Sequence, residues 1–241
     1  MKEIKLDILA FGAHPDDVEL GCGGTIAKEI SIGKKVGIID LTRGELGTRG
    51  NVMTRNSESE KASKILGISL RENLNFKDGF FSNDSTHQME VIKCIRKYKP
   101  EIVICNAQND RHIDHPKGAR LVSDSCFLSG LSKIKTVVND FDQSAWRPKA
   151  VYHYIQWNNS KPDFLVDISG FVDTKLKAIK AYKSQFFDLK SKEPETLISK
   201  VNFLNDVINR SADLGRLIGV DSAEGFTTNR VIAINNLNDI K

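Results

Sequence analysis

Two short polar segments carry the residue types that bind metal ions in proteins. Residues 13–19 read Ala-His-Pro-Asp-Asp-Val-Glu, and residues 110–115 read Asp-Arg-His-Ile-Asp-His. Together they hold three of the five histidines in the chain. Two histidines and one carboxylate are a common catalytic zinc set, because they leave a coordination position open for water. The spacing favours His14, Asp17 and His115 as that set, and the same donors also suit Fe²⁺ or Co²⁺.

The polar residues beside these ligands could carry out hydrolysis of an amide. Asp16 is next to a predicted ligand but free itself, so it is the predicted general base that takes the proton of a water molecule activated by the metal. His112 could stabilise the oxyanion or protonate the leaving amine. Asp114, two residues further on, is expected to hydrogen-bond to the His112 imidazole and raise its pKa. The set predicts metal-assisted amide hydrolysis.

Two arginines follow in a glycine-rich, charged region. Arg49 lies in the loop over residues 42–53, and Arg55 opens the helix expected after it. An arginine in such a loop can simply face solvent. Near a crevice, however, its planar guanidinium binds a carboxylate or phosphate through two hydrogen bonds. We therefore expect an anionic group on the substrate, with Arg55 as the favoured contact and Arg49 as the second.

Apolar runs separated by glycine and proline predict the elements that position these residues. Strands are expected over 6–11, 35–41, 71–76, 101–105, 151–157 and 164–168. Helices are expected over 25–32, 55–66, 87–98, from Pro116 onward, over 172–187 and over about 197–212. The alternation predicts an α/β, Rossmann-like fold with a mostly parallel sheet and helices on both faces.

This fold would bring the two motifs together although they are far apart in the sequence. The first motif follows the strand at 6–11, and the second follows the strand at 101–105. In the common strand order 3-2-1-4-5, which we assume here, these two strands are neighbours. Such folds bind ligands at the carboxyl ends of the strands at this switch point. The two motifs are therefore expected to face each other across one crevice.

Other features of the sequence have competing interpretations. The run Gly21-Cys22-Gly23-Gly24 precedes a helix as in dinucleotide sites, but the pattern G-x-G-x-x-G is incomplete because residue 26 is Ile. We expect close packing there, and keep a nucleotide-binding module as the least favoured function. His153, between two tyrosines, is expected to be structural rather than part of the pocket. Residues 223–226 could be ordinary packing or part of the pocket wall.

Composition limits the class of protein. The 241 residues are 40% hydrophobic and 27% charged, as expected for a soluble chain with one globular domain over 1–241. The net charge of +4 does not require a nucleic-acid partner. No apolar run approaches the roughly 20 residues of a membrane span. The start of the chain, through Asp7, lacks the features of a signal peptide, and the four cysteines form no CxxC pair, so we expect a cytoplasmic protein with reduced thiols.

The two motifs, read at residues 13–19 and 112–115, resemble the LmbE/PIG-L family of zinc-dependent N-acetylglucosaminyl deacetylases. The resemblance runs over nearly the whole chain. Within the family it is closest to the deacetylases of bacillithiol biosynthesis, with support from the segments 41–50, 181–186 and 223–226. It implies a Rossmann-like LmbE fold and removal of the acetyl group from N-acetylglucosaminyl malate. Another conjugate of N-acetylglucosamine, such as a chitooligosaccharide, is the alternative substrate.

The resemblance also implies roles for individual residues. It implies zinc on His14, Asp17 and His115, with Asp16 as general base. It implies His112, paired with Asp114, as the electrostatic or acid partner, and Arg55 as a contact to the malate carboxylates. Some relatives place a tyrosine over the oxyanion, but residues 194–199 contain none, which leaves Tyr152 and Tyr182 open as candidates. Some relatives form hexamers, so a homo-oligomer is a further expectation.

Overall fold

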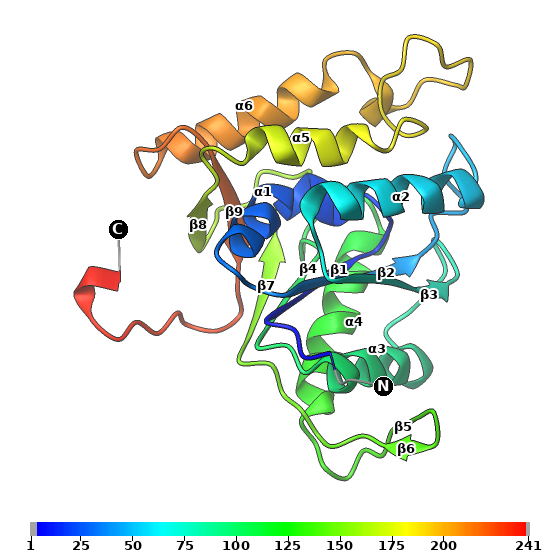
Figure 1. Cartoon of the computed structure of the whole chain (residues 1–241), viewed down its shortest axis with the longest axis vertical. Coiled ribbons are helices and arrows are strands. Elements are labelled where there is room, and N and C mark those ends of the chain that lie inside the picture. Colours follow the sequence, from blue (N-terminus) through cyan, green and yellow to red (C-terminus); the bar gives the residue numbers. More distant parts are fainter. Residues whose placement is uncertain (1–3, 240–241) are drawn as a thin grey trace.

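A single sheet organises the computed structural model, which describes residues 4–239 and leaves residues 1–3 of the N-terminal stretch outside its description (Figure 1). Its strands are β1 (Ile8–Gly12), β2 (Val36–Thr42), β3 (Leu70–Phe76), β4 (Ile102–Cys105), β7 (Ala150–Tyr154), β8 (Phe164–Asp167) and β9 (Ala223–Thr227). They lie in the order β3-β2-β1-β4-β7-β9-β8. β1 pairs in parallel with both β2 and β4, and β7 adds in parallel to β4. The strands that precede the two motifs are therefore neighbours, as predicted.

Helices cover both faces of this sheet, which confirms the predicted fold class (Figure 1). One face carries α1 (Asp17–Ser31), α2 (Val52–Leu66) and α5 (Val172–Lys180), which pack on one another. The other face carries α3 (Ser85–Tyr98) and α4 (Asp114–Ser129), while α6 (Phe203–Arg216) packs against β9. Short elements complete the chain: β5 (Val137–Val138), β6 (Phe141–Asp142), η1 (Leu197–Ser199) and η2 (Leu237–Asp239). Among residues 4–239, no helix combines the length and apolar character needed to cross a membrane.

The strands β1 and β4 are buried on both faces, which explains their continuous apolar sequences. In β1, Leu9 and Phe11 join the core beneath α3 and α4, whereas Ile8 and Ala10 join the core beneath α1 and α5. Successive side chains of a strand point to opposite faces, so one short strand contributes to both cores. The result is a rigid edge from which the loop carrying the first motif departs.

Three helix boundaries differ markedly from those expected. α1 begins at Asp17, well before residue 25, and bends at Cys22, whose φ is −145°. The glycines around this bend have low helix propensity, which hid the first turns of the helix. The helix expected over 172–187 ends at Lys180, and the one expected over 197–212 divides into η1 and α6.

The segment 223–226, for which no strand was predicted, lies in β9 and contributes to the wall of a cavity described below. β9 runs antiparallel between β7 and β8, and its pairing includes Tyr154 with Phe226 and Val166 with Glu224. Antiparallel strands need no crossover helix, so the alternation of strands and helices gave no signal for β9. Its position places the C-terminal part of the chain beside β7, which is the neighbour of β4.

The glycine run at the start of α1 serves close packing, as the simpler interpretation predicted. A Cβ atom added at Gly21 would lie 2.1 Å from Cδ2 of Tyr154, and one added at Gly24 would lie 2.7 Å from Cδ1 of Ile168. The space beside these glycines is therefore filled by side chains of the chain itself. This packing leaves no room there for a nucleotide, which disfavours the nucleotide-binding alternative.

Substitution of Gly21 by Ala is expected to destabilise the fold by about 1–3 kcal/mol, because the new methyl group overlaps the buried Tyr154 ring. Gly23→Ala is the matched control, since its Cβ would meet Lys175 Cγ at an ordinary 3.4 Å. Urea unfolding of both variants and the wild type measures the difference. Equal free energies of unfolding for the two variants would contradict the packing role of Gly21.

Candidate active site

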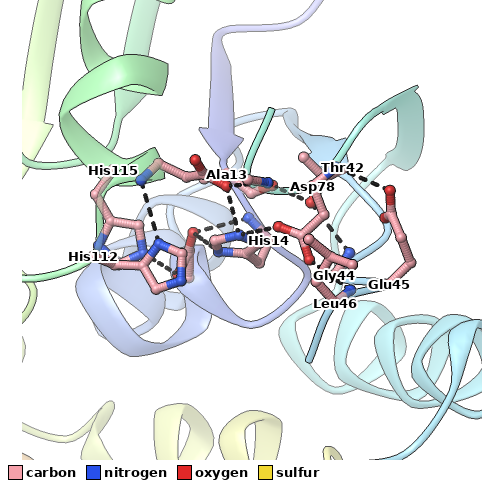
Figure 2. Close-up of polar contacts among 12 residues, drawn as sticks. Ala13, His14, Thr42, Gly44, Glu45, Leu46, Asp78, His112 and His115 are labelled. Carbon is pink, nitrogen blue, oxygen red and sulfur yellow. Dashed lines mark hydrogen bonds and ion pairs between the residues drawn. The ribbon is translucent and has the colours of Figure 1, made fainter. Parts of the chain in front are cut away.

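Loops that follow β1, β4 and β3 meet at the carboxyl edge of the sheet, in which β2 lies between β1 and β3. His14 follows β1, His112 and His115 lie at the start of α4 after β4, and Asp78 lies in the loop after β3. Figure 2 shows His14 between the two other imidazoles on one side and the Asp78 carboxylate on the other. The ring centroids of His14 and His112 are 4.6 Å apart, and those of His112 and His115 are 5.0 Å apart. The structure thus brings the two motifs together.

The Asp17 carboxylate lies at the centre of this cluster. Its Oδ2 atom accepts hydrogen bonds from the backbone N–H of His14 at 2.9 Å and from Asn106 Nδ2 at 3.0 Å. Its Oδ1 atom accepts a hydrogen bond from Gln156 Nε2 at 2.7 Å and lies 3.2 Å from His115 Nε2. Groups from β1, β4, β7 and α4 therefore fix one carboxylate, which is buried with an exposed fraction of 2%.

Each of the two imidazoles beside Asp17 has a second carboxylate on its other nitrogen. His14 Nδ1 lies 3.5 Å from Asp17 Oδ2, while its Nε2 lies 3.0 Å from Asp78 Oδ1. His115 faces Asp17 through Nε2, while its Nδ1 lies 3.3 Å from Asp110 Oδ2 without hydrogen-bond geometry. Metal-binding histidines characteristically have such an outer carboxylate, which fixes the ring orientation and raises ligand basicity.

The electrostatics of the cluster favour a bound cation. Burial opposes protonation of His14 and His115, but the surrounding carboxylates outweigh it, raising the pKa of His14 well above its usual range and that of His115 to about 9. Burial likewise opposes ionisation of Asp17, yet the two imidazoles hold its pKa well below the usual range. The carboxylates therefore place excess negative charge around the two imidazoles. Protons on the imidazoles compensate this charge here, and a divalent metal ion would compensate it in the same place.

The donor atoms are close enough to share a metal ion. Ligand atoms of His14, His112 and His115 lie within 4.8 Å of one another, and so do ligand atoms of His14, Asp78 and Asp114. Both sets include His14, and Asp17 contacts two members of the first. Nitrogen and carboxylate donors in a partly open, buried cluster are the chemistry that zinc and similar divalent ions require. The residues present therefore fit a metal ion.

Asp16 lies beside this cluster in a strained conformation. Its φ of 119° is in the region that residues with a side chain rarely adopt, and such strain costs of the order of 1–3 kcal/mol. The Arg55 guanidinium donates to Asp16 Oδ2 at 2.9 Å and, through Nε and Nη2, to the carbonyl oxygen of Pro15. Burial raises the pKa of Asp16 to about 7, and the charge of Arg55 opposes this rise. Arg55 thus holds the turn that presents Asp16.

Asp114 and His112 differ from the expectation. The Asp114 carboxylate lies 3.4 Å from His14 Nε2 and bonds to Gly79 N and Lys117 Nζ, rather than to the His112 ring. The contact with His112 comes from the Asp114 backbone, whose N–H donates to His112 Nδ1 at 3.3 Å. Burial and the neighbouring imidazoles lower the pKa of His112, the opposite of the expected rise. The start of α4 turns this carboxylate toward β1 and away from His112.

Arg49 lies against the segment 184–194 instead of facing solvent. Its Nε, Nη1 and Nη2 atoms donate to Ser184 O, Pro194 O and Ser191 Oγ at 2.8–3.1 Å. Arg49 therefore connects the loop after β2 to the loop after α5. Sequence type identified the residue, but it could not show that all three nitrogens already have acceptors within the protein.

One cavity of about 700 Å³ contains the cluster and extends away from it. Asp16, Asp17, Arg49, Arg55 and the three motif histidines line it, and its far walls come from the loop after β7, from α6 and from β9. The candidate tyrosines lie elsewhere, since Tyr182 donates to Glu19 Oε1 and the Tyr152 ring packs on Phe164. His153 is buried against Asn106 O, as its structural interpretation predicted. The cavity is large enough for a substrate longer than one acetylated sugar.

Asp78 and Gln156 were missed by the sequence analysis, and both contact predicted ligands. Asp78 follows the expected strand 71–76, and Gln156 follows β7, which ends at Tyr154 and is shorter than the expected strand 151–157. A rule that inspects every polar residue just beyond a parallel strand would have found both, because all these carboxyl ends share one edge. Neither lies in a recognisable motif.

Comparison with known proteins shows which family the chain belongs to. Residues 9–126 match the model of the GlcNAc-PI de-N-acetylase family, PIG-L. The crystal structure of the conserved protein TT1542 from Thermus thermophilus is 33% identical, with a TM-score of 0.85 over 96% of this chain and 98% of that chain. The chain belongs to the PIG-L/LmbE family of deacetylases.

Two similar proteins are both named as deacetylases of diacetylchitobiose. A diacetylchitobiose deacetylase of Thermococcus kodakarensis is 29% identical over 191 residues, which cover 74% of this chain and 70% of the relative. The structure of the N,N'-diacetylchitobiose deacetylase from Pyrococcus horikoshii, in complex with an inhibitor, is 26% identical. It has a TM-score of 0.77 over 91% of this chain and 82% of that chain.

Substitution of Asp78 by Asn is expected to weaken binding of a divalent metal by about 10- to 100-fold, because His14 loses its outer carboxylate. Affinity for zinc is measured by competition with a chromogenic chelator at neutral pH. Asp124→Asn is the matched control, since Asp124 lies on α4 and pairs with Arg120 away from the site. Equal zinc affinities for both variants would remove Asp78 from the candidate site.

Proposed function

We propose that the protein is a zinc-dependent deacetylase that hydrolyses the acetamide of an N-acetylglucosamine conjugate to acetate and the free amine. The preferred substrate is N-acetylglucosaminyl malate, which yields glucosaminyl malate in bacillithiol biosynthesis. The observation that carries the proposal is the convergence of His14, Asp17 and His115 beside Asp16 within a cavity of about 700 Å³. We further propose a cytoplasmic enzyme whose partner is a small anionic sugar conjugate, not nucleic acid or membrane.

The proposed roles follow from the positions of the side chains. His14, Asp17 and His115 would hold the metal ion, whose charge activates water and polarises the acetamide carbonyl. Asp16 accepts the proton of the attacking water. It is a buried carboxylate beside the ligands, and it pairs with Arg55 rather than with the imidazole of His14 or His115. Arg55 keeps that carboxylate oriented through the bond to Oδ2.

His112 is suited to the opposite side of the reaction. Because the Asp114 N–H donates to Nδ1, the ring proton of a neutral His112 is on Nε2. An imidazole of this tautomer donates a hydrogen bond to the oxygen that becomes negative during attack. The proton taken by Asp16 then passes to the nitrogen of the leaving sugar amine, which leaves the carboxylate ready for another turnover.

A chitooligosaccharide is the second candidate substrate. The two deacetylases described above are named for diacetylchitobiose, and both align with most of this chain. A neutral sugar chain would use the same reaction at the acetamide but would not need a cationic group in the cavity. The homo-oligomer expected from the resemblance stays a prediction.

The reaction is tested by release of acetate from N-acetylglucosaminyl malate and from diacetylchitobiose, with and without a chelator. We expect faster hydrolysis of the malate conjugate, loss of activity with the chelator and recovery on addition of zinc. Faster hydrolysis of diacetylchitobiose would transfer the proposal to the second substrate. Full activity in metal-free protein would contradict the metal-dependent reaction.

Substitution of Asp16 by Asn is expected to lower kcat by about 10²- to 10⁴-fold, because the amide cannot accept the proton of water. Metal content should not change, since the predicted ligands are intact. Asp213→Asn, at an exposed carboxylate on α6, controls for loss of charge alone. Turnover of the Asp16→Asn variant near that of the control would exclude Asp16 as the base.

A further inference from the structure

Recognition of an anionic substrate needs a cation with free donors in the cavity. The two arginines expected to supply it are already engaged. Arg55 uses Nε and Nη2 on Pro15 and Asp16, and its Nη1 lies against the backbone of Gly44, where a Cβ would come within 2.5 Å. All three nitrogens of Arg49 donate to the segment 184–194. Both guanidinium groups therefore hold protein loops in place.

Arg210 on α6 is different, because most of its donors are free. It lines the same cavity as the candidate metal ligands. Only its Nη2 atom has acceptors, the backbone oxygen of Trp157 and, at 3.5 Å, Asn159 Oδ1. Among residues 4–239, no acceptor bonds to its Nε or Nη1, and no carboxylate lies within 4.0 Å. Two N–H directions of this half-buried guanidinium are therefore available to a ligand.

The charge of Arg210 is poorly compensated by the protein. Burial lowers the pKa of its guanidinium, and Asp110 only partly opposes this. In contrast, burial opposes the charge of Arg55 but Asp16 and the other acidic groups around it together outweigh burial, so the pKa of Arg55 is raised. The oxygen Asp110 Oδ2 already accepts from Trp157 N at 3.0 Å and lies 3.3 Å from His115. Asp206 also lines the cavity one turn earlier on α6, but it forms no ion pair with Arg210 within 4.0 Å.

The residue that holds Arg210 is itself rigid. The Trp157 ring stacks on Phe203, with ring centroids 6.2 Å apart. The Arg111 guanidinium lies over the same Trp157 ring, 4.5 Å from its centroid. Through Asp110, the backbone of Trp157 is also connected to His115. A chain of contacts thus positions Arg210 relative to the candidate metal ligands, with the cavity between them.

We propose that Arg210 binds a carboxylate on the non-sugar part of the substrate while the acetamide lies at the metal ligands. The inference rests on the proposed function and adds the residue that selects an anionic conjugate. A guanidinium with two free donors suits a carboxylate, because hydrogen bonds between charged partners are stronger than those between neutral ones. Arg210 is thus assigned the substrate contact first expected of Arg55 and Arg49.

The experiment compares N-acetylglucosaminyl malate with its neutral diamide in wild type, Arg210→Met, Arg210→Lys and Arg216→Met. Arg216 is the matched control, because it lies on the same helix but is exposed and paired with Asp213. Acetate release gives kcat and KM, and calorimetry gives the affinity for each conjugate. For Arg210→Met we expect kcat/KM on the malate conjugate to fall by about 10- to 100-fold, mainly through KM. The value for the diamide should change less than about threefold, within the range of one weak contact.

The comparison of the two conjugates separates recognition from structure. Displacement of the Trp157 loop would impair both substrates, so equal losses in Arg210→Met would overturn the inference. Two results would support the inference: a partial recovery of kcat/KM on the malate conjugate in Arg210→Lys, and an unchanged kcat/KM in Arg216→Met. If the wild type hydrolyses neither conjugate, the proposed function fails, and calorimetry still shows whether Arg210 discriminates between them. Equal affinities of wild type and Arg210→Met for the malate conjugate would then overturn the inference.

Discussion

The position of the Asp17 carboxylate is the constraint on which the candidate site depends. Its two oxygens receive groups from four separate elements, including Asn106 after β4 and Gln156 after β7. These partners can meet only because β1, β4 and β7 are parallel neighbours with their carboxyl ends at one edge. The strand order of the sheet thus places the hydrogen-bond donors around Asp17. The buried carboxylate in turn holds the imidazoles of His14 and His115 toward one point.

The residues around Asp17 include a strained backbone conformation and several buried charged groups, both of which are rare in a hydrophobic core. Asp16 keeps a positive φ, and Arg55 bonds to both residues of the turn. Carboxylates crowd the two imidazoles from the inner and the outer side. Unfavourable local geometry of this kind persists when the surrounding structure holds it and the function requires it. The arrangement is consistent with a site formed before the substrate binds.

Much of the fold and part of the site could be predicted from the sequence. Periodic apolar segments gave the first strands and most helices, and the rule for parallel sheets brought the two motifs together. Residues outside this alternation were missed: β9 pairs antiparallel, and Asp78 lies in a loop without a motif. The roles of the arginines could not be predicted either, because residue type does not show which donors are satisfied. Only coordinates separate Arg49, with every nitrogen engaged, from Arg210, with most of them free.

The reacting groups and the distal wall of the cavity come from different stretches of the chain. The candidate metal ligands lie between His14 and His115, whereas β9 and α6 enclose the space beyond. Substitutions in α6 and β9 would therefore alter the far wall of the cavity without replacing any candidate metal ligand. The cavity therefore joins two separately encoded regions of the chain, one that carries the candidate metal ligands and one that bounds the space beyond them.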